Sequence, residues 1–348
     1  MSMTAIQARE FGGPQVLTPA SVPDPLPGPG EALIAVSAAD VLFLDAMIRS
    51  GIARAAFPQR PPYIPGNGVA GHVTEVGEGT DPAWIGRPAV ARTGPHGGMG
   101  GYAERALVPA SHLVAVPEGV DLRVAAALMH DGATALGLMA GTPVRPGETV
   151  LLVGAAGGMA LVLAQLARAA GARVIGAARL EGATRRTEKA DAIRRAGAEA
   201  VVDYGSPDWT SRVADETGGT GPDVVFDGVG GPLGQAAFAI VADGGRFSAH
   251  GTPGGGFAPV SAREAKEHGV TVRGIEQVQF PPSRHEELIT EVIAEAAAGR
   301  LQPVIGQVFP LRRAADAHAA MAARSTIGKT LLLADQSMIE EPIPLPPE

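Results

Sequence analysis

The sequence predicts an α/β protein in which a doubly wound parallel sheet is combined with a smaller, mostly β domain. Two observations lead to this prediction. Short apolar runs alternate with helical segments through the middle of the chain, and strand-like runs between Pro/Gly clusters fill its N-terminal part. Strands that alternate with helices are typical of parallel sheets, whereas short strands between turn signals are typical of compact β domains.

Six apolar runs supply the strands expected in the parallel sheet. The first, Val150–Val153, has no polar residue, as a strand buried on both faces requires. Six is also the number of strands in a complete doubly wound dinucleotide-binding sheet. The six runs cover 150–153, 173–177, 200–203, 223–227, 245–249 and 270–274; further strands are expected over 31–37, 69–76 and 328–333, the last returning to the first domain, and helices over 125–140 and 286–298.

A Gly-rich turn follows the first of these six strands. It contains Gly154, Gly157 and Gly158. A helix expected over 160–170 follows, and Gly171 is suited to end it in the left-handed conformation. Glycines let the backbone approach a pyrophosphate, and the free N–H groups of a helix N-terminus bind its charge. The unit therefore predicts a dinucleotide site, against the alternative of a Gly-rich turn that binds nothing.

The end of the second strand indicates which dinucleotide is bound. A free 2′-hydroxyl on the adenosine ribose usually meets an Asp or Glu about 20 residues after the turn. This strand instead ends in two alanines and Arg179. The next segment is basic, with Arg185, Arg186 and Lys189. Cations favour a 2′-phosphate, so we expect NADPH rather than NADH. The alternative is a basic helix start that only faces water.

Composition excludes several classes of function. The chain has 348 residues, enough for two domains, and 45% of them are hydrophobic. A net charge of −8 without a basic stripe argues against nucleic-acid binding. The absence of cysteine excludes disulfides, thiol nucleophiles and Cys-based zinc sites. The sequence shows neither a leader pattern nor an apolar run of about 18 residues, so we expect a cytoplasmic protein without a membrane span.

Several short motifs occur in a characteristic order along the chain. They are Ile48-Arg49-Ser50-Gly51, Pro65-Gly66-Asn67-Gly68-Val69-Ala70-Gly71, Gly101-Tyr102-Ala103-Glu104, the Gly154–Ala160 turn, Asp223–Gly231 and Gly328-Lys329. With these motifs the chain resembles the zinc-independent quinone oxidoreductase branch of the medium-chain dehydrogenase/reductase superfamily. The resemblance implies a GroES-like, mostly β catalytic domain over 1–122 and 277–348, with a loose tail from 337. It also implies a Rossmann dinucleotide-binding domain over 123–276.

The superfamily has a zinc-dependent branch, and this chain departs from it at the metal-binding positions. The resemblance places Leu42 and Asn67 where that branch has a Cys and a His ligand. Zinc needs three or four nitrogen, sulfur or oxygen ligands, and a leucine side chain offers none. We therefore expect no metal, and no alcohol oxidation through a metal alkoxide.

The resemblance also implies which residues surround the cofactor. Thr134 is expected near the nicotinamide ribose and the backbone of Ile275 near the carboxamide. The remaining residues form three groups: Ala156, Gly157, Gly158 and Met159 at the pyrophosphate; Arg179, Lys189 and Tyr204 around the 2′-phosphate; and Gly230, His250 and Gly251 on the nicotinamide side. The segment 180–188 is longer than usual, so Arg185 and Lys189 remain alternatives for the phosphate contact.

The expected substrate pocket differs from that of its relatives. Leu42, Met47 and Asn67 are expected to line it, and the resemblance implies Asn and Tyr at the first two of these positions. Losing this polar pair makes the pocket more apolar.

Two side chains are candidates for proton transfer. His130 stands where the resemblance implies a small or apolar residue, and it could donate a proton or hold a substrate carbonyl. The alternative is a histidine at a helix start that bonds only to backbone. Tyr63, in a Pro-rich loop, is the second candidate. Asp131 is expected to cap a following helix, and Tyr102 is expected to be a packing residue.

The expected function is that of an NADPH-dependent, zinc-free reductase that transfers hydride to a quinone or an α,β-unsaturated carbonyl. A conjugated acceptor can take hydride without a Lewis acid if the protein orients it and excludes water. The alternatives are a biosynthetic tailoring or enoyl-thioester reductase, which the apolar pocket favours, and an NADPH-binding module with little activity. The resemblance also implies a homodimer formed by pairing of the strand over 270–274.

Overall fold

The computed structural model describes residues 1–93, 100–335 and 337–340. The chain forms two compact units: unit 1 comprises Met1–His130 and Pro282–Glu348, and unit 2 comprises Asp131–Pro281. The sequence placed the corresponding boundaries a few residues earlier, before 123 and 277. Helix α2 (Leu122–Gly141) runs across the first boundary without a break.

Unit 1 is built on a mostly antiparallel sheet, with one parallel pair (β14–β15), to which both ends of the chain contribute. The strand order is β14-β15-β3-β4-β5-β7, with β6 also paired to β3 and a separate β1–β2 hairpin. The strands are β1 (Ser2–Ala8), β2 (Leu17–Pro23), β3 (Glu31–Asp40), β4 (Gly68–Val76), β5 (Pro88–Arg92), β6 (Arg105–Pro109), β7 (Val114–Ala115), β14 (Ile305–Pro310) and β15 (Lys329–Leu333). The expected strand over 328–333 therefore does return to the first domain, where it pairs antiparallel with β3.

The helices of unit 1 are short or lie near its ends. They are α1 (Phe43–Ser50), α8 (Pro282–Ala297), α9 (Ala314–Ala322), α10 (Ser337–Glu340) and the first part of α2, with 3₁₀ turns η1 (Pro14–Val16), η2 (Pro82–Trp84), η3 (Ala110–His112) and η5 (Leu311–Arg313). Small aliphatic side chains from β3, β4 and β5 form part of the core, together with residues of β1, β6 and α9. Of the tail expected to be loose, residues 337–340 form helix α10, and residues 341–348 lie outside the described residues.

Unit 2 is a six-stranded parallel sheet in the order β10-β9-β8-β11-β12-β13. Its strands are β8 (Thr149–Val153), β9 (Arg173–Ala178), β10 (Ala200–Asp203), β11 (Val224–Asp227), β12 (Arg246–Ala249) and β13 (Thr271–Arg273), so all six predicted strands are confirmed. In chain order the arrangement reads 3-2-1-4-5-6, which is the doubly wound topology. The order reverses between β8 and β11, and ligands bind outside the carboxyl ends of the strands at such a point.

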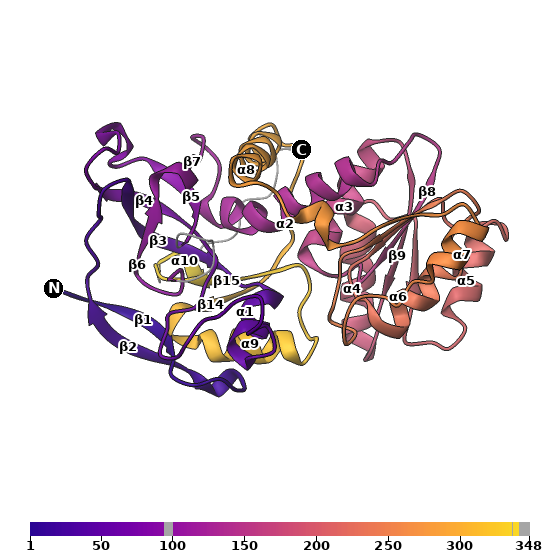
Figure 1. Cartoon of the computed structure of the whole chain (residues 1–348), viewed down its shortest axis with the longest axis horizontal. Coiled ribbons are helices and arrows are strands. Elements are labelled where there is room, and N and C mark those ends of the chain that lie inside the picture. Colours follow the sequence, from indigo (N-terminus) through magenta and orange to yellow (C-terminus); the bar gives the residue numbers. More distant parts are fainter. Residues whose placement is uncertain (94–99, 336, 341–348) are drawn as a thin grey trace. The chain divides into compact units, whose positions relative to one another are not determined.

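Helices cover both faces of this sheet, since each crossover between parallel strands carries one (Figure 1). Figure 1 shows α3 and α4 on one side of the strands and α5 and α7 on the other. The helices are α3 (Gly158–Ala169), α4 (Ala183–Arg195), α5 (Trp209–Glu216), α6 (Gly231–Phe238) and α7 (Ala262–Glu267), with a 3₁₀ turn η4 (Ile275–Val278). Gly171, expected to end the helix after the first strand, has φ +82°.

Helix α2 corrects two expectations. Because it begins at Leu122 and continues to Gly141, Asp131 lies in its interior and is not an N-cap. The same helix is long and apolar enough, by length and composition, to span a membrane, although no apolar run was expected to reach that length. Of its most apolar window, 61% is buried inside the structure, which is typical of a core helix.

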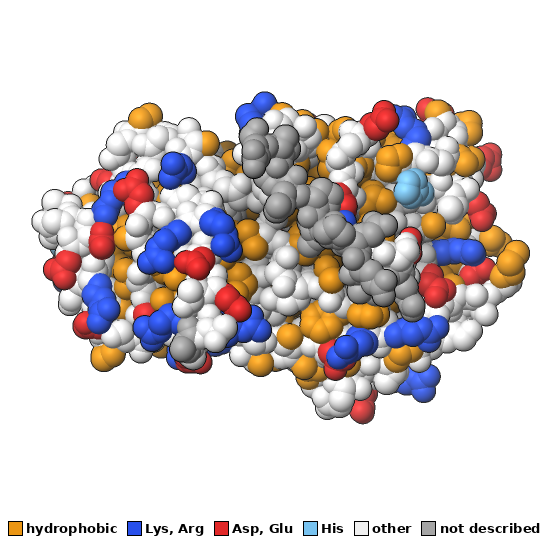
Figure 2. All heavy atoms as spheres, turned by 180° about the vertical axis from the view of Figure 1, so that it is seen from behind, with side chains coloured by type: hydrophobic (Ala, Val, Ile, Leu, Met, Phe, Trp, Pro, Cys, Tyr) orange, Lys and Arg blue, Asp and Glu red, His pale blue; other side chains and the backbone are white. Residues whose placement is uncertain are grey.

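The surface carries both signs of charge. On the face shown in Figure 2, Lys and Arg side chains lie interspersed with Asp and Glu side chains. This mixture agrees with the net charge of −8 and forms no broad basic stripe on the described part of that face.

Candidate active and cofactor sites

The Gly-rich turn of unit 2 has the backbone that phosphate binding requires. Gly154, directly after β8, has φ +87°, a conformation that L side chains rarely adopt. Gly157 is the N-cap of α3, and among the described residues no side chain caps this helix start. The first N–H groups of a helix lack intrahelical partners, so they can bind a phosphate. Helix α3 begins at Gly158, slightly before the expected start, so Met159 lies in its first turn.

A second loop meets the turn at the reversal point of the sheet. Asp227, at the end of β11, is buried, and its Oδ1 accepts hydrogen bonds from the N–H groups of Val229 (2.9 Å) and Gly230 (2.8 Å). Gly230 has φ +73°, and a Cβ there would lie 2.4 Å from the carbonyl oxygen of Gly251. The backbone of the loop after β11 therefore packs directly on the loop after β12.

His250 follows β12 and is held by a chain of polar side chains. Its Nδ1 lies 3.0 Å from Ser248 Oγ, which accepts a hydrogen bond from Gln277 Nε2 (2.8 Å), and Thr142 Oγ1 donates to Gln277 Oε1 (3.0 Å). Burial lowers the pKa of His250 to about 4, against a smaller opposite effect of a backbone hydrogen bond at Ser248. His250 is therefore neutral at physiological pH.

The structure thus brings most of the predicted cofactor residues to one edge of unit 2. A Cβ on Gly154 would lie 3.0 Å from Val229 Cγ2, and one on Gly228 would lie 3.6 Å from His250 Nε2. The turn over 156–159, Gly230 and the pair 250–251 consequently share the carboxyl edge of the sheet. Thr134 lies on α2 and Ile275 begins η4, which Gln277 ties to β12.

The basic residues after β9 form two groups. Lys189 Nζ donates to the carbonyl oxygen of Arg179 (3.1 Å), and the Arg179 guanidinium lies 6.0 Å from the ring centre of Tyr204. Arg185 pairs with Glu188 on the exposed face of α4 (3.4 Å). Of the two alternatives for a phosphate contact, the structure therefore brings Lys189, and not Arg185, next to Arg179.

Acidic side chains also lie in this region, although none was expected there. Arg179 Nη1 pairs with Glu181 (3.0 Å), and Arg186 pairs with Asp203 (3.3 Å). Asp203 Oδ1 additionally accepts the N–H groups of Leu180 (3.1 Å) and Gly205 (2.9 Å). Glu181 was overlooked because it lies two residues after the arginine, and Asp203 because it belongs to the next strand.

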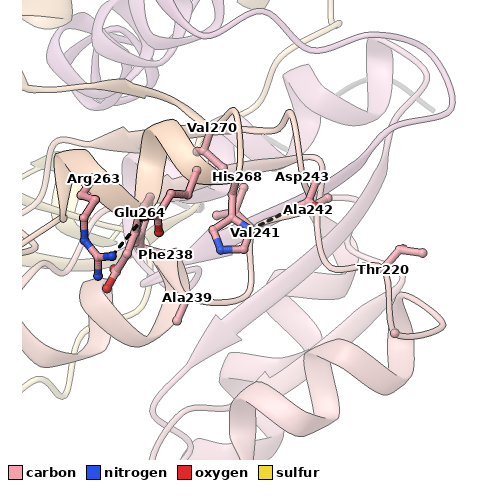
Figure 3. Close-up of a pocket in the computed structure, with 12 residues that line it drawn as sticks. Thr220, Phe238, Ala239, Val241, Ala242, Asp243, Arg263, Glu264, His268 and Val270 are labelled. Atoms are coloured by element: carbon pink, nitrogen blue, oxygen red, sulfur yellow. Dashed lines mark hydrogen bonds and ion pairs between the residues drawn. The ribbon is translucent and has the colours of Figure 1, made fainter.

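A surface pocket of unit 2 lies at the opposite edge of the sheet (Figure 3). Thr220, Asp243 and Val270, which line it, precede β11, β12 and β13, and are therefore at the amino ends of these strands. His268 Nδ1 and Asp243 Oδ1 are joined there by an exposed hydrogen bond of 2.8 Å. Dinucleotides bind at the carboxyl ends, so this pocket is not the cofactor site.

In unit 1 the expected pocket residues lie around a buried carboxylate. Asp45, in the first turn of α1, is 2% exposed. Asn67 Nδ2 donates to its Oδ1, whereas Leu42 N–H (2.9 Å) and the Tyr102 hydroxyl (3.1 Å) donate to its Oδ2. Asn67 thus contributes its side-chain amide N–H to the Asp45 carboxylate, whereas Leu42 contributes only its backbone N–H, because its side chain has no polar atom. Tyr102, expected only to pack, is a hydrogen-bonding member of this network.

The network continues to His318 on α9, and its donors can be assigned. Arg49 Nη1 can only donate, so His318 Nδ1 accepts (3.2 Å) and Nε2 carries the proton. Nε2–H then donates to the Tyr102 hydroxyl (3.0 Å), which donates onward to Asp45. Burial, with a smaller effect of Arg49, lowers the pKa of His318 to about 3, so the ring is neutral.

Asp45 and the neighbouring Tyr63 both hold their protons more tightly than usual. Burial, reinforced by the charge of Asp40, raises the pKa of Asp45 to about 6, although hydrogen bonds from Leu42, Asn67 and Tyr102 oppose the shift. Burial and Asp45 together raise the pKa of Tyr63 to about 12, against the effect of Arg49. Among the described residues the buried Tyr63 hydroxyl has no hydrogen-bond partner.

His130 belongs to a second polar cluster in unit 1. Its Nδ1 lies 2.9 Å from Oδ2 of Asp40, and Lys329 Nζ lies 3.2 Å from the same oxygen. Asp40 and Lys329 are almost completely buried, and the His130 side chain is 14% exposed. His130 therefore bonds to a buried carboxylate, not to backbone at a helix start.

Comparisons with known proteins agree with this geometry. Family models described as "Alcohol dehydrogenase GroES-like domain" and "Zinc-binding dehydrogenase" match residues 28–118 and 196–332. A 2-haloacrylate reductase of a Burkholderia species is 33% identical over 96% of this chain and 99% of its own length. A quinone oxidoreductase of Pseudomonas aeruginosa is 32% identical over 94% of this chain and 98% of its own length.

The chain belongs to the medium-chain dehydrogenase/reductase superfamily, in its quinone oxidoreductase branch. It is an oxidoreductase of the α/β class with a GroES-like domain and a Rossmann domain. A mycobacterial protein solved in complex with NADPH superimposes with a TM-score of 0.84 at 34% identity, over 95% of this chain and 100% of that protein. The resemblance inferred from the motifs is thus confirmed.

Sequence reasoning missed the charged partners of both clusters in unit 1. Asp40 ends the apolar strand β3, and Lys329 opens the apolar strand β15. A charged residue at the edge of a fully apolar strand must find a partner when it is buried. That signal was available, but the identity of the partner depends on how β15 and α2 pack against β3.

We expect the charge of Asp45 to make folding stability depend on pH. Its pKa of about 6 in the folded protein exceeds the ordinary value of 3.8. Between these two pH values the folded state binds more protons than the unfolded state. The stability that protonated Asp45 contributes is therefore lost as the pH rises through 6. From pH 5 to pH 7.5, the free energy of unfolding of wild type should therefore fall by about 1.4 kcal/mol more than that of Asp45→Asn.

Urea denaturation at the two pH values measures this difference, because a constant cost of replacing the carboxylate by an amide cancels. Asp191→Asn is a suitable control, since Asp191 forms an exposed pair with Arg194. A pH dependence of Asp45→Asn parallel to that of wild type would show that Asp45 is already ionised at pH 5.

Proposed function

We propose that this protein is an NADPH-dependent reductase, independent of zinc, that transfers hydride to a quinone or an α,β-unsaturated carbonyl compound. The main support is the joint presence of two features: an α3 N-terminus that no described side chain caps, behind a Gly-rich turn, and the group of Arg179, Lys189 and Tyr204 at the end of β9. Relatives named quinone oxidoreductase and 2-haloacrylate reductase support the substrate class.

The residues of unit 2 fit a dinucleotide phosphate. The α3 N-terminus with Gly157 and Gly158 would bind the pyrophosphate through backbone N–H groups, with Ala156 and Met159 flanking it. Arg179, Lys189 and Tyr204 would surround the 2′-phosphate. The guanidinium of Arg179 would have to exchange Glu181 for the phosphate, and that pair is mostly exposed and therefore weak.

The nicotinamide side would be formed by Gly230, His250 and Gly251, with Thr134 and the backbone of Ile275 nearby. When bound, reduced nicotinamide supplies the hydride. His250, neutral because its pKa is about 4, would offer a hydrogen bond there without adding a charge. The chain's task is then to orient the acceptor and exclude water.

Leu42, Met47 and Asn67 are proposed to line the acceptor pocket in unit 1. The side chains of Leu42 and Met47 are partly exposed and apolar, which suits the flat hydrocarbon face of a conjugated acceptor. His130 is proposed as the proton donor. Tyr63 is a weaker candidate, because a pKa of about 12 makes proton release harder.

Independence from zinc is supported by the residues at the two expected ligand positions. Leu42 has a hydrocarbon side chain, and Asn67 has a neutral amide. Neither position therefore offers the thiolate, imidazole or carboxylate that zinc prefers.

The assembly and the location are proposed from analogy and strand geometry. Strand β13 is the last strand of the unit 2 sheet, so one row of its backbone groups faces away from β12. Pairing of two such edges would give a homodimer. We also propose a cytoplasmic location, with no nucleic acid or membrane as partner; the described part of the face in Figure 2 carries both signs of charge, without the broad basic surface that nucleic-acid binding favours.

A panel of acceptors tests the proposed function. NADPH absorbance is followed with a benzoquinone, an enone and a 2-haloacrylate, and we expect turnover with at least one of them. An enoyl thioester in the same panel tests for the biosynthetic alternative. Tight NADPH binding without turnover on any acceptor would identify a binding module and contradict the proposal.

Cofactor choice should depend on Arg179. A charge-assisted hydrogen bond contributes about 1.5–3 kcal/mol, which corresponds to roughly a 10- to 150-fold change in affinity. Arg179→Ala should raise KM for NADPH by this factor and leave KM for NADH nearly unchanged. Arg185→Ala, which removes the exposed pair with Glu188, is the matched control and should change neither. Equal use of both cofactors by wild type, or an equal loss for both in Arg179→Ala, would contradict this assignment.

Activity should survive chelation. We expect the purified protein to contain far less than one zinc per chain by elemental analysis, and prolonged treatment with a chelator to leave kcat unchanged. Stoichiometric zinc whose removal abolishes turnover would show that ligands other than those at positions 42 and 67 bind a catalytic metal.

A further inference from the structure

Three elements that are distant in sequence each place one ionisable side chain at the same buried point of unit 1. Asp40 ends β3, His130 lies on α2, and Lys329 opens β15. One carboxylate oxygen, Oδ2 of Asp40, is shared by His130 Nδ1 (2.9 Å) and Lys329 Nζ (3.2 Å). The other oxygen, Oδ1, has no hydrogen-bond partner among the described residues. In this cluster, two groups that can carry a positive charge, the His130 imidazole and the Lys329 ammonium, contact the single carboxylate of Asp40.

Asp40 is ionised in this setting. Burial alone would raise its pKa, but Lys329 and His130, by charge and by hydrogen bonds, lower the pKa below its ordinary value. An ionised carboxylate only accepts hydrogen bonds, so the proton of the contact must reside on His130 Nδ1. The tautomer of the neutral ring is thereby fixed, and Nε2 is the nitrogen that can gain or release a proton.

The ring is also fixed in position. A Cβ on Gly68 would lie 2.8 Å from His130 Cε1 and 2.6 Å from the sulfur of Met129. The imidazole therefore packs on the backbone directly after Asn67, one of the expected pocket residues. At 14% exposure it is the accessible member of a cluster whose other members are buried.

The remaining groups around His130 do not replace Asp40 or Lys329. From α8, the His285 ring meets His130 edge to face at 5.8 Å. Burial, followed by His130, Arg92 and His112, lowers the pKa of His285 to about 3, so this ring is neutral. Arg92 of β5 is paired with Glu286 (2.6 Å), and Asp131 follows His130 on α2. Among the described residues, the carboxylate paired with the His130 ring is that of Asp40, and the same carboxylate oxygen is paired with Lys329.

We infer that Asp40 and Lys329 are positioning residues for His130: Asp40 fixes the ring with Nε2 toward the acceptor, and Lys329 sets how readily that nitrogen releases its proton. The inference rests on the proposed reductase function. With reduced nicotinamide bound, which would supply the hydride and be oxidised, the electron-poor carbon of the acceptor would gain a C–H bond, and the electron pair of its conjugated double bond would move to the carbonyl oxygen. Nε2–H of the His130 imidazolium then protonates the resulting anion, the N–H bond breaks, and the neutral ring is reprotonated by solvent.

The two positioning residues have opposite effects on the ring. Asp40 stabilises the imidazolium by its negative charge, whereas Lys329 destabilises it by neutralising the same carboxylate. A charge within about 4–6 Å of an ionisable group shifts the pKa of that group by roughly 1–3 units. Removing Asp40 should therefore make His130 release its proton at lower pH, and removing Lys329 should make it release the proton at higher pH.

NMR titration of the isotope-labelled full-length protein tests this directly and needs no acceptor. We expect the Nδ1–H tautomer in wild type. The midpoint of the His130 titration should fall by about 1 unit or more in Asp40→Asn and rise by a similar amount in Lys329→Met. Lys266→Met, on the exposed helix α7, is the matched control and should not move it. The double variant Asp40→Asn/Lys329→Met removes the buried ion pair as a whole and is used if a single variant does not fold. Its midpoint should lie below that of wild type, because the carboxylate that contacts the ring is lost, and an unchanged midpoint would contradict the role of Asp40.

The pH profile of kcat then connects the cluster to turnover. We expect kcat to fall as the pH rises through the same midpoint in each variant, and His130→Ala to lose roughly 100-fold or more of kcat. An Nε2–H tautomer, or midpoints that do not move in opposite directions, would overturn the positioning roles. Midpoints that shift without any change in the kcat profile would overturn proton donation by His130. Opposite shifts in a protein without turnover on any acceptor would keep the positioning roles and refute the reductase function.

Discussion

The buried contact between Lys329 and Asp40 is the constraint on which the architecture of unit 1 most depends. It joins the first residue of β15, near the C-terminus, to the last residue of β3, near the N-terminus. A buried ion pair adds little net stability compared with apolar residues, but removing one partner leaves an uncompensated buried charge that costs several kcal/mol. Together with the backbone pairing of β15 and β3, the contact joins the two ends of the chain in one sheet. By also accepting His130, Asp40 ties α2 to the same place.

Two aspartates five residues apart show how strongly neighbours decide the charge of a buried group. Asp40 has a lowered pKa because an ammonium and an imidazole share its oxygen. Asp45 has neutral hydrogen-bond donors and the negative charge of Asp40 nearby, and its pKa is raised to about 6. The cluster around Asp45 includes Asn67 and Tyr102 and fixes the start of α1, which carries Leu42 and Met47 toward the expected pocket. The cluster around Asp40 holds His130, whose imidazole can take up and release a proton.

Unit 2 reaches its function by a different route, since backbone rather than side chains forms most of the proposed cofactor site. Asp227 uses one oxygen to bind two successive N–H groups, which shapes the loop where Gly230 takes a positive φ. The loop after β12 then packs backbone to backbone against it, in space that a side chain at Gly230 or Gly251 would fill. Side chains are proposed to contribute at the two ends of the site: Arg179, Lys189 and Tyr204 at one end, and His250 with Thr134 at the other.

The sequence by itself determined the sheet of unit 2, the Gly-rich turn and the family. Each depends on local signals: apolar runs long enough for buried strands, glycines at the turn, and motifs in a fixed order. It also singled out His130 by its polarity. Only the tertiary structure decided what His130 contacts, because Asp40 and Lys329 are 90 residues or more away along the chain and meet it through packing. Likewise, the continuity of α2 through Asp131 and the pairing of Arg179 with Glu181 follow from helix packing and side-chain reach, which local sequence patterns do not contain.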